Sequence, residues 1–216
     1  MRLLFVLLLS ILFFNPQQKE RVLVDDFESN DLDDWRGRRK GFENIYRIKK
    51  EANNAYLSAD SKDSDNLIVK RVYVDLNEYP YLNWRWRARA IPENGNESLR
   101  FYCDTPASLA VVLNRSRIFP KSIKYSWSAS LPESLITKSP YARWPAKCDV
   151  VITESGESNL NTWVYEKVNV KKDLEKFYKR SDLRRKDVFA IVLMTDSDNL
   201  GQLSAADYDD IYFSRN

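Results

Sequence analysis

The sequence has 216 residues, 44% of them hydrophobic, with 34 Lys and Arg against 31 Asp and Glu and no histidine. This length and composition fit one folded domain and exclude a disordered chain, and the interleaved charges argue against a nucleic-acid-binding protein. Because the chain has no histidine, catalysis by a Ser-His-Asp or Cys-His arrangement is excluded. Its two cysteines cannot form a zinc site of four thiolates. Any bound metal would therefore be a hard cation held by oxygen atoms.

Residues 1–18 have the pattern of an export signal. Arg2 precedes an apolar run from residue 3 to residue 14 that is interrupted only by Ser10. This run is shorter than the roughly 20 residues that a membrane-spanning helix requires, and it matches the apolar part of a secretory signal. Because no small-x-small cleavage pattern follows it, residues 1–18 are either a cleaved signal or a retained membrane tether. We therefore expect an exported protein that contacts a membrane only through this segment.

The remainder, residues 19–216, is predicted to be a single all-β domain. Short segments rich in β-branched and aromatic residues alternate with turn-forming residues, which favours an antiparallel β-sandwich of jelly-roll type over βαβ units. The predicted strands are 21–27, 46–49, 55–59, 66–74, 81–91, 108–113, 123–128, 148–152, 163–170, 188–194 and 207–213. The segment 188–194 is apolar throughout and is predicted to be a central strand buried on both faces. Leu174, Phe177 and Tyr178 form an apolar stripe that predicts one short helix over residues 171–180.

Residues 81–91 are the clearest amphipathic strand. Trp84 and Trp86 alternate with Arg85, Arg87 and Arg89. Because successive side chains of a strand point to opposite faces, the tryptophans lie on one face and the arginines on the other. We expect the tryptophans to be in the core. The alternative is that they form a flat platform on which sugar rings stack.

The same strand supplies most of a candidate ligand-binding set. Alternate positions of a strand lie roughly 6.5 to 7 Å apart, a spacing that suits a series of carboxylates or phosphates. Trp144 lies between Pro140 and Pro145 in a predicted loop, and it is the tryptophan that we expect to be exposed. The candidate ligand-binding residues are Arg85, Arg87, Arg89 and Trp144. The alternative is that the arginines pair with acidic residues on the same face of the sheet.

Acidic residues gather at the first and last predicted strands. Glu28 follows the first strand, and Asp209 and Asp210 belong to the last. The terminal strands of a sandwich are often neighbours, and carboxylates brought together there repel one another unless a cation lies between them. We therefore predict a structural calcium ion held by Glu28, Asp209 and Asp210. The alternative is that these residues are solvated acids of turns and strand ends.

A second acidic segment, residues 196–201, begins like a calcium-binding loop. Asp196 and Asp198 are followed by Gly201 at the sixth position. Leu200 occupies a position where such a loop requires an oxygen ligand. We interpret the segment as a tight turn after the buried strand.

Cys103 and Cys148 leave two interpretations open. In an oxidising compartment they would pair, and closing the loop between them would stabilise the fold by roughly 4 kcal/mol. Otherwise they are two buried thiols. The sequence does not show whether their Cβ atoms face each other.

Several motifs follow one another along nearly the whole chain after the signal. They are Val24-Asp25-Asp26-Phe27-Glu28, Asn83-Trp84-Arg85-Trp86-Arg87, Lys124-Tyr125-Ser126-Trp127, Trp163-Val164-Tyr165-Glu166, Met194-Thr195-Asp196-Ser197-Asp198 and Tyr208-Asp209-Asp210-Ile211. In this order they resemble a bacterial family, domain of unknown function 3047. The resemblance implies a periplasmic or secreted β-sandwich similar in outline to galactose-binding-like and carbohydrate-binding modules, some of which hold a structural calcium ion between acids of the first and last strands. The segment 98–107, which contains Cys103, departs from the family pattern.

Together these features predict a non-catalytic exported envelope protein that binds a glycan or another polar surface polymer. The basis is the export signal, the sandwich pattern, the many aromatic residues and the lack of a catalytic motif. One alternative is a structural or assembly module that docks a periplasmic protein through the helix and the arginine row. A less favoured alternative is a glycoside hydrolase that uses two carboxylates, although no spacing singles out a pair.

Overall fold

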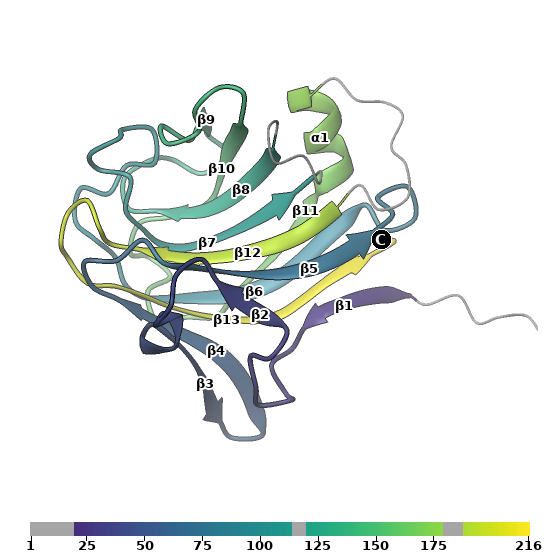
Figure 1. Cartoon of the computed structure of the whole chain (residues 1–216), viewed down its shortest axis with the longest axis horizontal. Coiled ribbons are helices and arrows are strands. Elements are labelled where there is room, and N and C mark those ends of the chain that lie inside the picture. The colour runs from purple at the N-terminus through teal and green to yellow at the C-terminus, as the bar shows by residue number, and fades with distance from the viewer. Residues whose placement is uncertain (1–19, 114–119, 179–187) are drawn as a thin grey trace, which may run out of the picture.

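The alternating segments of the sequence fold into two twisted sheets that lie face to face (Figure 1). The structure is a computed structural model that describes residues 20–113, 120–178 and 188–216. Within these ranges, α1 (Val170–Tyr178) lies at one end of the sandwich, and a short 3-10 helix, η1 (Phe42–Asn44), precedes the third strand. The predicted β-sandwich with one short helix is therefore confirmed.

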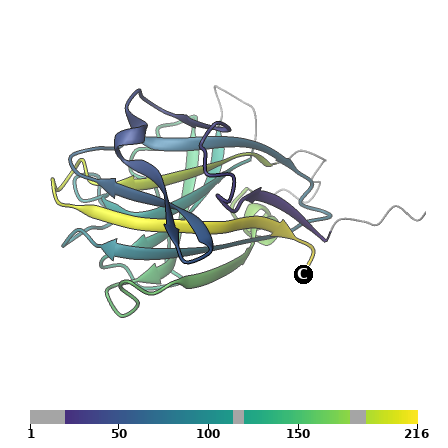
Figure 2. The ribbon, with the colours of Figure 1, turned by 90° about the horizontal axis from the view of Figure 1, so that it is seen from below.

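The six-stranded sheet is built around the last strand of the chain. In spatial order its strands are β11 (Val164–Asn169), β6 (Tyr81–Ala90), β13 (Ser204–Ser214), β4 (Asn54–Ser61) and β3 (Tyr46–Glu51), and β1 (Arg21–Asp25) also pairs with β13. The first and last strands are thus neighbours, as the sequence predicts. Figure 2, in which the molecule is seen from below, shows β13 running along this sheet.

The seven-stranded sheet forms the other layer. In spatial order its strands are β2 (Trp35–Gly37), β5 (Leu67–Val74), β12 (Val188–Asp196), β7 (Thr105–Val112), β8 (Lys121–Ser128), β10 (Lys147–Ser155) and β9 (Ile136–Lys138). All neighbouring strands are antiparallel except β8 and β10, which run parallel. Residues 129–146 carry the chain back across the sheet between these two strands, because a parallel pair requires a long connection.

Three features of this sheet differ from the sequence-based expectation. The sequence does not predict β2 and β9, because three residues are too few to show an alternating pattern. The parallel pair also departs from a wholly antiparallel sandwich. The central place of β12 is confirmed, but Val192 and Met194 on its outer face are only half-buried because they line a groove.

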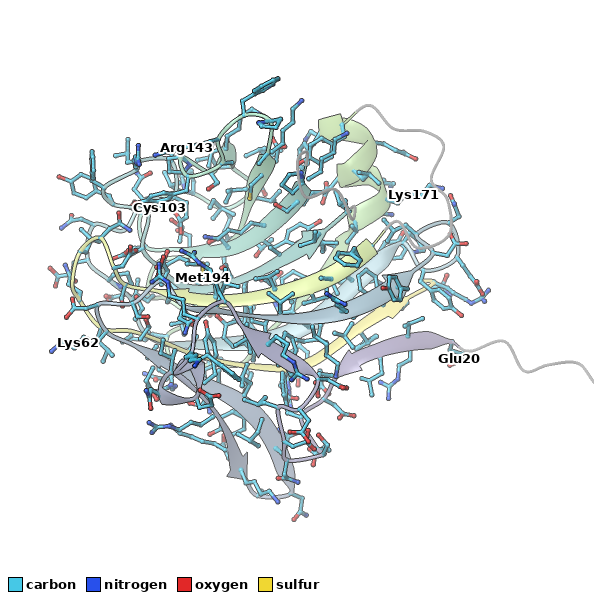
Figure 3. The ribbon with its side chains drawn as sticks, in the orientation of Figure 1. Glu20, Lys62, Cys103, Arg143, Lys171 and Met194 are labelled. Carbon is cyan, nitrogen blue, oxygen red and sulfur yellow. The ribbon has the colours of Figure 1, made fainter. Side chains whose placement is uncertain are left out.

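The two sheets are joined by tightly packed aromatic rings. The Trp84 and Trp86 ring centroids lie 5.2 Å apart, Trp84 lies 5.7 Å from Tyr125 of β8, and Trp86 lies 6.0 Å from Trp127. All four side chains are at most 1% exposed, so the core placement of the tryptophans is confirmed and the stacking-platform alternative is wrong. Side chains of both sheets fill the space between them (Figure 3).

Two tyrosine hydroxyls from the six-stranded sheet also reach the backbone of β12. The Tyr46 hydroxyl donates to the carbonyl of Asn66 (3.0 Å) and accepts from the Thr195 N–H (3.1 Å). The Tyr208 hydroxyl donates to the carbonyl of Met194 (2.9 Å) and lies 2.8 Å from Thr195 Oγ1. Thr195 is thereby held inward, and the alternation of the strand directs its neighbour Asp196 outward.

The N-terminal segment 1–18, interpreted above as a signal or a tether, lies outside the described residues. Within the described ranges, no helix has the length and apolar character needed to cross a membrane.

The edge where the two sheets meet contains two neighbouring carboxyl groups, one half-buried and one buried. Glu166 of β11 faces Glu154 of β10, which is 6% exposed. Burial, together with repulsion from Glu154, raises the pKa of Glu166 to about 8. In the unfolded chain a glutamate titrates near 4.3. Between these two pH values the folded state holds a proton that the unfolded state lacks, so folding stability falls as pH rises from about 4.3 to about 8.

We therefore expect Glu166→Gln to flatten the pH dependence of stability. From pH 5 to pH 8 the unmodified protein should lose up to about 1.4 kcal/mol of unfolding free energy per pH unit relative to the variant, which cannot release this proton. Urea unfolding at pH 5, 6.5 and 8 measures the difference. Glu157→Gln, an exposed position, is the control and should follow the unmodified protein. Parallel stability curves for Glu166→Gln and the unmodified protein would contradict the prediction.

Candidate functional site

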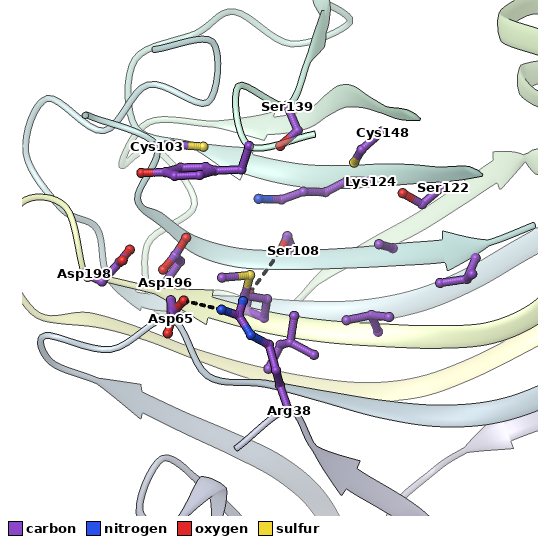
Figure 4. A pocket seen from close by; sticks show the side chains of 16 residues that line it. Arg38, Asp65, Cys103, Ser108, Ser122, Lys124, Ser139, Cys148, Asp196 and Asp198 are labelled. Atoms are coloured by element: carbon purple, nitrogen blue, oxygen red, sulfur yellow. Dashed lines mark hydrogen bonds and ion pairs between the residues drawn. The ribbon is translucent and has the colours of Figure 1, made fainter. Parts of the chain in front are cut away.

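The outer face of the seven-stranded sheet holds a groove with a volume of about 490 Å³ (Figure 4). The groove is lined by Arg38, Asp65, Leu67, Cys103, Ser108, Ala110, Val112, Ser122, Lys124, Ser139, Tyr141, Cys148, Val192, Met194, Asp196 and Asp198. Strands β5, β12, β7 and β8 supply the floor, and the segment from Ser139 to Cys148 supplies one wall.

The floor of the groove follows directly from strand alternation. On β8, Tyr125 and Trp127 point into the core, so Ser122 and Lys124 point outward. On β7 the outward residues Ser108 and Ala110 are small. The small side chains on β7 leave space above the sheet, and this space is part of the groove.

Lys124 is the cation in the middle of the groove (Figure 4). Across the described part of the chain, no hydrogen bond or salt bridge reaches its ammonium group. Burial alone would lower the pKa of Lys124, but the facing groups, Cys103, Asp196 and Glu97 among them, raise it above its usual value. Lys124 is therefore a charged hydrogen-bond donor whose protons are directed into the groove without a protein acceptor.

One end of the groove is acidic. Asp196 and Asp198 lie side by side there (Figure 4), and Asp104 lies close behind them. Asp196 is 5% exposed, whereas Asp198 is exposed to solvent. The pKa of Asp196 is raised to about 8. Burial is the largest cause of this rise, repulsion from Asp198 and Asp104 adds to it, and attraction to Lys124 opposes only part of it.

The two sides of the groove are held by polar contacts. Tyr141 is 45% exposed, and the guanidinium carbon of Arg100 lies 5.5 Å from its ring centroid. Its hydroxyl lies 2.7 Å from the carbonyl of Arg100 and 2.5 Å from Asn199 Oδ1. On the opposite side, Arg38 forms a salt bridge of 2.8 Å with Asp65. Tyr141 thus presents an aromatic face beside charged groups.

A buried carboxylate supports the groove from behind. Glu97 is fully buried and accepts hydrogen bonds from Ser128 Oγ (2.5 Å) and Ser126 Oγ (3.3 Å) of β8. Gly95 is needed in the same loop, because a Cβ atom there would lie 2.7 Å from the carbonyl oxygen of Asp104. The loop is therefore packed closely against the acidic end of the groove.

Cys103 and Cys148 both line the groove as free thiols, and no disulfide joins them. They lie on either side of Lys124 in Figure 4. Burial raises the pKa of Cys103 to about 11 and also raises the pKa of Cys148. Both thiols are therefore protonated at neutral pH and act as groove lining.

The predicted arginine row lies on the outer face of the six-stranded sheet, away from the groove. Arg87 and Arg89 bind the buried carboxylate of Asp207 at 2.8 and 2.9 Å, and Arg85 binds Asp209 at 2.5 Å. The arginines of this row thus form the ion pairs that the sequence left as an alternative. Ligand binding by Arg85, Arg87 and Arg89 stays a prediction.

Trp163 covers part of this row. The guanidinium carbons of Arg85 and Arg87 lie 4.8 and 4.7 Å from its ring centroid, and Tyr56 meets the same ring edge-on at 5.6 Å. These cation–π contacts hold the two guanidinium groups against one indole ring.

The predicted calcium ligands have protein partners. Glu28 Oε1 accepts the N–H of Ala55 at 2.8 Å, and Asp209 and Asp210 are both bound to Arg85. Over the described ranges, a group of three acidic side chains close enough to share an ion occurs at Asp104, Asp196 and Asp198 and not at these residues. Calcium at Glu28, Asp209 and Asp210 stays a prediction.

Trp144 is 85% exposed, which confirms the expectation for this side chain. It belongs to the segment that forms the wall of the groove, although it does not line the groove itself. Its part in ligand binding stays a prediction.

One pattern in the sequence indicates the floor of the groove, although the predicted binding residues do not include it. On β8, Ser122, Lys124 and Ser126 alternate with apolar residues, so polar side chains repeat on one face of a strand that lies inside a sheet. Such a face is either solvated or functional. Asp104 and Tyr141 have no comparable signal, because only the folded chain brings their loops to the groove.

The arginine row generates a stability prediction. Asp207→Asn removes the buried carboxylate that Arg87 and Arg89 share, and leaves these two partly buried guanidinium groups with only their more exposed partners, Glu51 and Asp60. We expect a loss of about 3 kcal/mol in unfolding free energy, measured by urea denaturation. Asp60→Asn is the matched control, since Asp60 also binds Arg89 but is 45% exposed, and it should change stability by less than about 1 kcal/mol. Equal losses in the two variants would refute the prediction.

The chain is similar in fold to several solved structures and matches the model of one protein family. No curated protein matches the sequence significantly. Among solved structures, the chain is similar to the carbohydrate-binding module CBM27-1 of Caldicellulosiruptor saccharolyticus in complex with mannohexaose, with 10% identity over 92% of this chain and 99% of that one and a TM-score of 0.48. It is also similar to the family 11 carbohydrate-binding module of the cellulase Lic26A-Cel5E of Clostridium thermocellum, with 10% identity over 90% and 94% of the two chains and a TM-score of 0.45. At these identities and TM-scores, neither likeness bears on the ligand or the site.

The sequence resemblance to domain of unknown function 3047 is confirmed by the family model. That model, described as protein of unknown function (DUF3047), matches residues 33–212. The match covers most of the chain, and the protein therefore belongs to this family.

Proposed function

We propose that the protein is an exported, non-catalytic module that binds a glycan in the groove on the outer face of the seven-stranded sheet. The observation that carries the proposal is the ammonium group of Lys124, which lies in the middle of a groove with a floor of small side chains and has no protein acceptor among the described residues. A partly buried charge without a partner is unfavourable, and a ligand oxygen would satisfy it.

The mixture of groups around Lys124 supports a ligand rich in hydroxyl groups. Arg38 and Ser122 offer donors, whereas Asp196 and Asp198 offer acceptors. A hydroxyl group both donates and accepts a hydrogen bond, so it fits a site that has both kinds of partner close together. A ligand with a single sign of charge would meet repulsion from one set of these residues.

The aromatic side of the groove supports a sugar ring in particular. The exposed face of Tyr141 lies beside polar groups, and a sugar has one apolar C–H face together with hydroxyl groups at its edge. The volume of about 490 Å³ lies within the range of about 300–1,000 Å³ that is typical of ligand pockets. With residues 1–18 as an export signal, a glycan of the cell envelope is the polymer that the module would meet.

Substitutions in the groove test this proposal. We expect Lys124→Met to weaken binding at least about tenfold, because a hydrogen bond to a charged group contributes about 1.5–3 kcal/mol. Tyr141→Ala should weaken binding by about tenfold through loss of the ring, whereas Tyr141→Phe should retain it. An array of purified bacterial polysaccharides identifies the glycan, and isothermal titration calorimetry measures Kd for each variant.

The control is Lys50→Met, a lysine that is exposed on β3 of the other sheet. It should bind like the unmodified protein, and thermal melts should show that every variant is folded. Unchanged affinity of Lys124→Met, or binding to no polysaccharide on the array, would refute the proposal. Reducing-end assays on any bound glycan separate binding from hydrolysis, since a module that only binds releases no new ends.

A further inference from the structure

Three carboxylates from distant parts of the chain converge at the acidic end of the groove. Asp104 immediately precedes β7, Asp196 is the last residue of β12, and Asp198 lies in the turn that follows. One oxygen atom from each lies within 4.8 Å of the others. Two segments about ninety residues apart in sequence are therefore folded so that three carboxyl groups meet.

Asp104 fixes the turn that carries Asp198. Its Oδ1 accepts the backbone N–H of Asn199 (3.1 Å) and the Asn199 side-chain amide (3.0 Å), and its Oδ2 accepts the N–H of Leu200 (2.7 Å). The side chain is fully buried. Asp104 and the turn that carries Asp198 are thus held together by hydrogen bonds.

Asp196 provides a second, independent observation. The residue is 5% exposed, and its Oδ1 atom is buried with no hydrogen-bond partner in the described part of the chain. A buried carboxylate oxygen without a donor is unfavourable, and native structures satisfy most such atoms. Lys124 faces this cluster, but one ammonium group does not balance three carboxylates.

We propose that Asp104, Asp196 and Asp198 form a binding site for a calcium ion at the end of the groove. Calcium binds oxygen ligands at about 2.3–2.6 Å, so two oxygens on one ion are at most about 5 Å apart, which agrees with the separation of up to 4.8 Å in this cluster. The set contains only oxygen donors and no histidine, which fits a hard cation and not zinc.

The site opens to the groove on one side. Asp198 is exposed, and both Asp198 and Asp196 line the groove. Calcium takes six to eight ligands, so its remaining positions would face water or a ligand in the groove. The proposal differs from calcium at Glu28, Asp209 and Asp210, because it uses other residues on the other sheet. It also stands apart from the glycan proposal, since calcium binding is measured without a glycan.

The test uses the full chain after treatment with EDTA and removal of the chelator. Calcium chloride is titrated by calorimetry, and thermal melts are recorded with and without calcium. We expect one bound ion and a rise in Tm of about 5–10 °C at a calcium concentration one hundred times Kd. Asp198→Asn should weaken calcium binding at least tenfold and remove the Tm shift, and it should fold normally because the side chain is exposed.

Asp210→Asn is the matched control, because it removes the same charge from the other predicted calcium site. Its φ of 50° is also a backbone conformation that asparagine tolerates. This variant should bind calcium like the unmodified protein. The proposal is overturned if the unmodified protein shows neither heat nor a Tm shift in millimolar calcium, if Asp198→Asn binds normally, or if only Asp210→Asn loses binding.

Discussion

The structure depends on the contact of Trp84 and Trp86 on β6 with Tyr125 and Trp127 on β8. These four buried rings join the two sheets, and they determine which face of each strand points inward. A shift of β8 by one residue would expose both rings of that strand and bury the charge of Lys124. Because such a shift loses the core and buries an ion, the aromatic contact fixes the position of the groove floor together with the fold.

The same alternation places charged residues on both outer faces, but the two faces differ in how these charges are satisfied. On the six-stranded sheet, Asp207 lies between Arg87 and Arg89, and each charge has a partner on the same face. On the seven-stranded sheet, Lys124 and one oxygen of the Asp196 carboxylate lack a hydrogen-bond partner within the described ranges. The first face therefore uses its hydrogen-bonding groups for stability, whereas the second leaves some of them free, and we propose that a ligand binds these. This difference is the physical reason to place the binding site on the second face.

Much of the fold can be predicted from the sequence, because period-two alternation is local. The strand at residues 81–91, the central strand at 188–194 and the helix that contains Leu174 all follow from nearby residues. The site cannot be predicted in the same way. Asp104 and Asp196 come together only through the pairing of β7 with β12, and the loop of Tyr141 reaches the groove only because β10 pairs with β8. These contacts join segments far apart in sequence, and no local pattern encodes them.

The parallel pairing of β8 and β10 also bears on how this family can diversify. Within the connection between them, residues 139–146 start and end at β9 and β10, strands whose places are set by their own hydrogen bonds. The length of this segment can therefore change at small energetic cost, since loop-closure entropy grows only slowly with length. Insertions or deletions here would reshape the wall that bears Tyr141 while the sheet stays the same. The wall beside the proposed site and the strands that carry the core are thus separate stretches of the sequence, and the wall is free to change at little cost in stability.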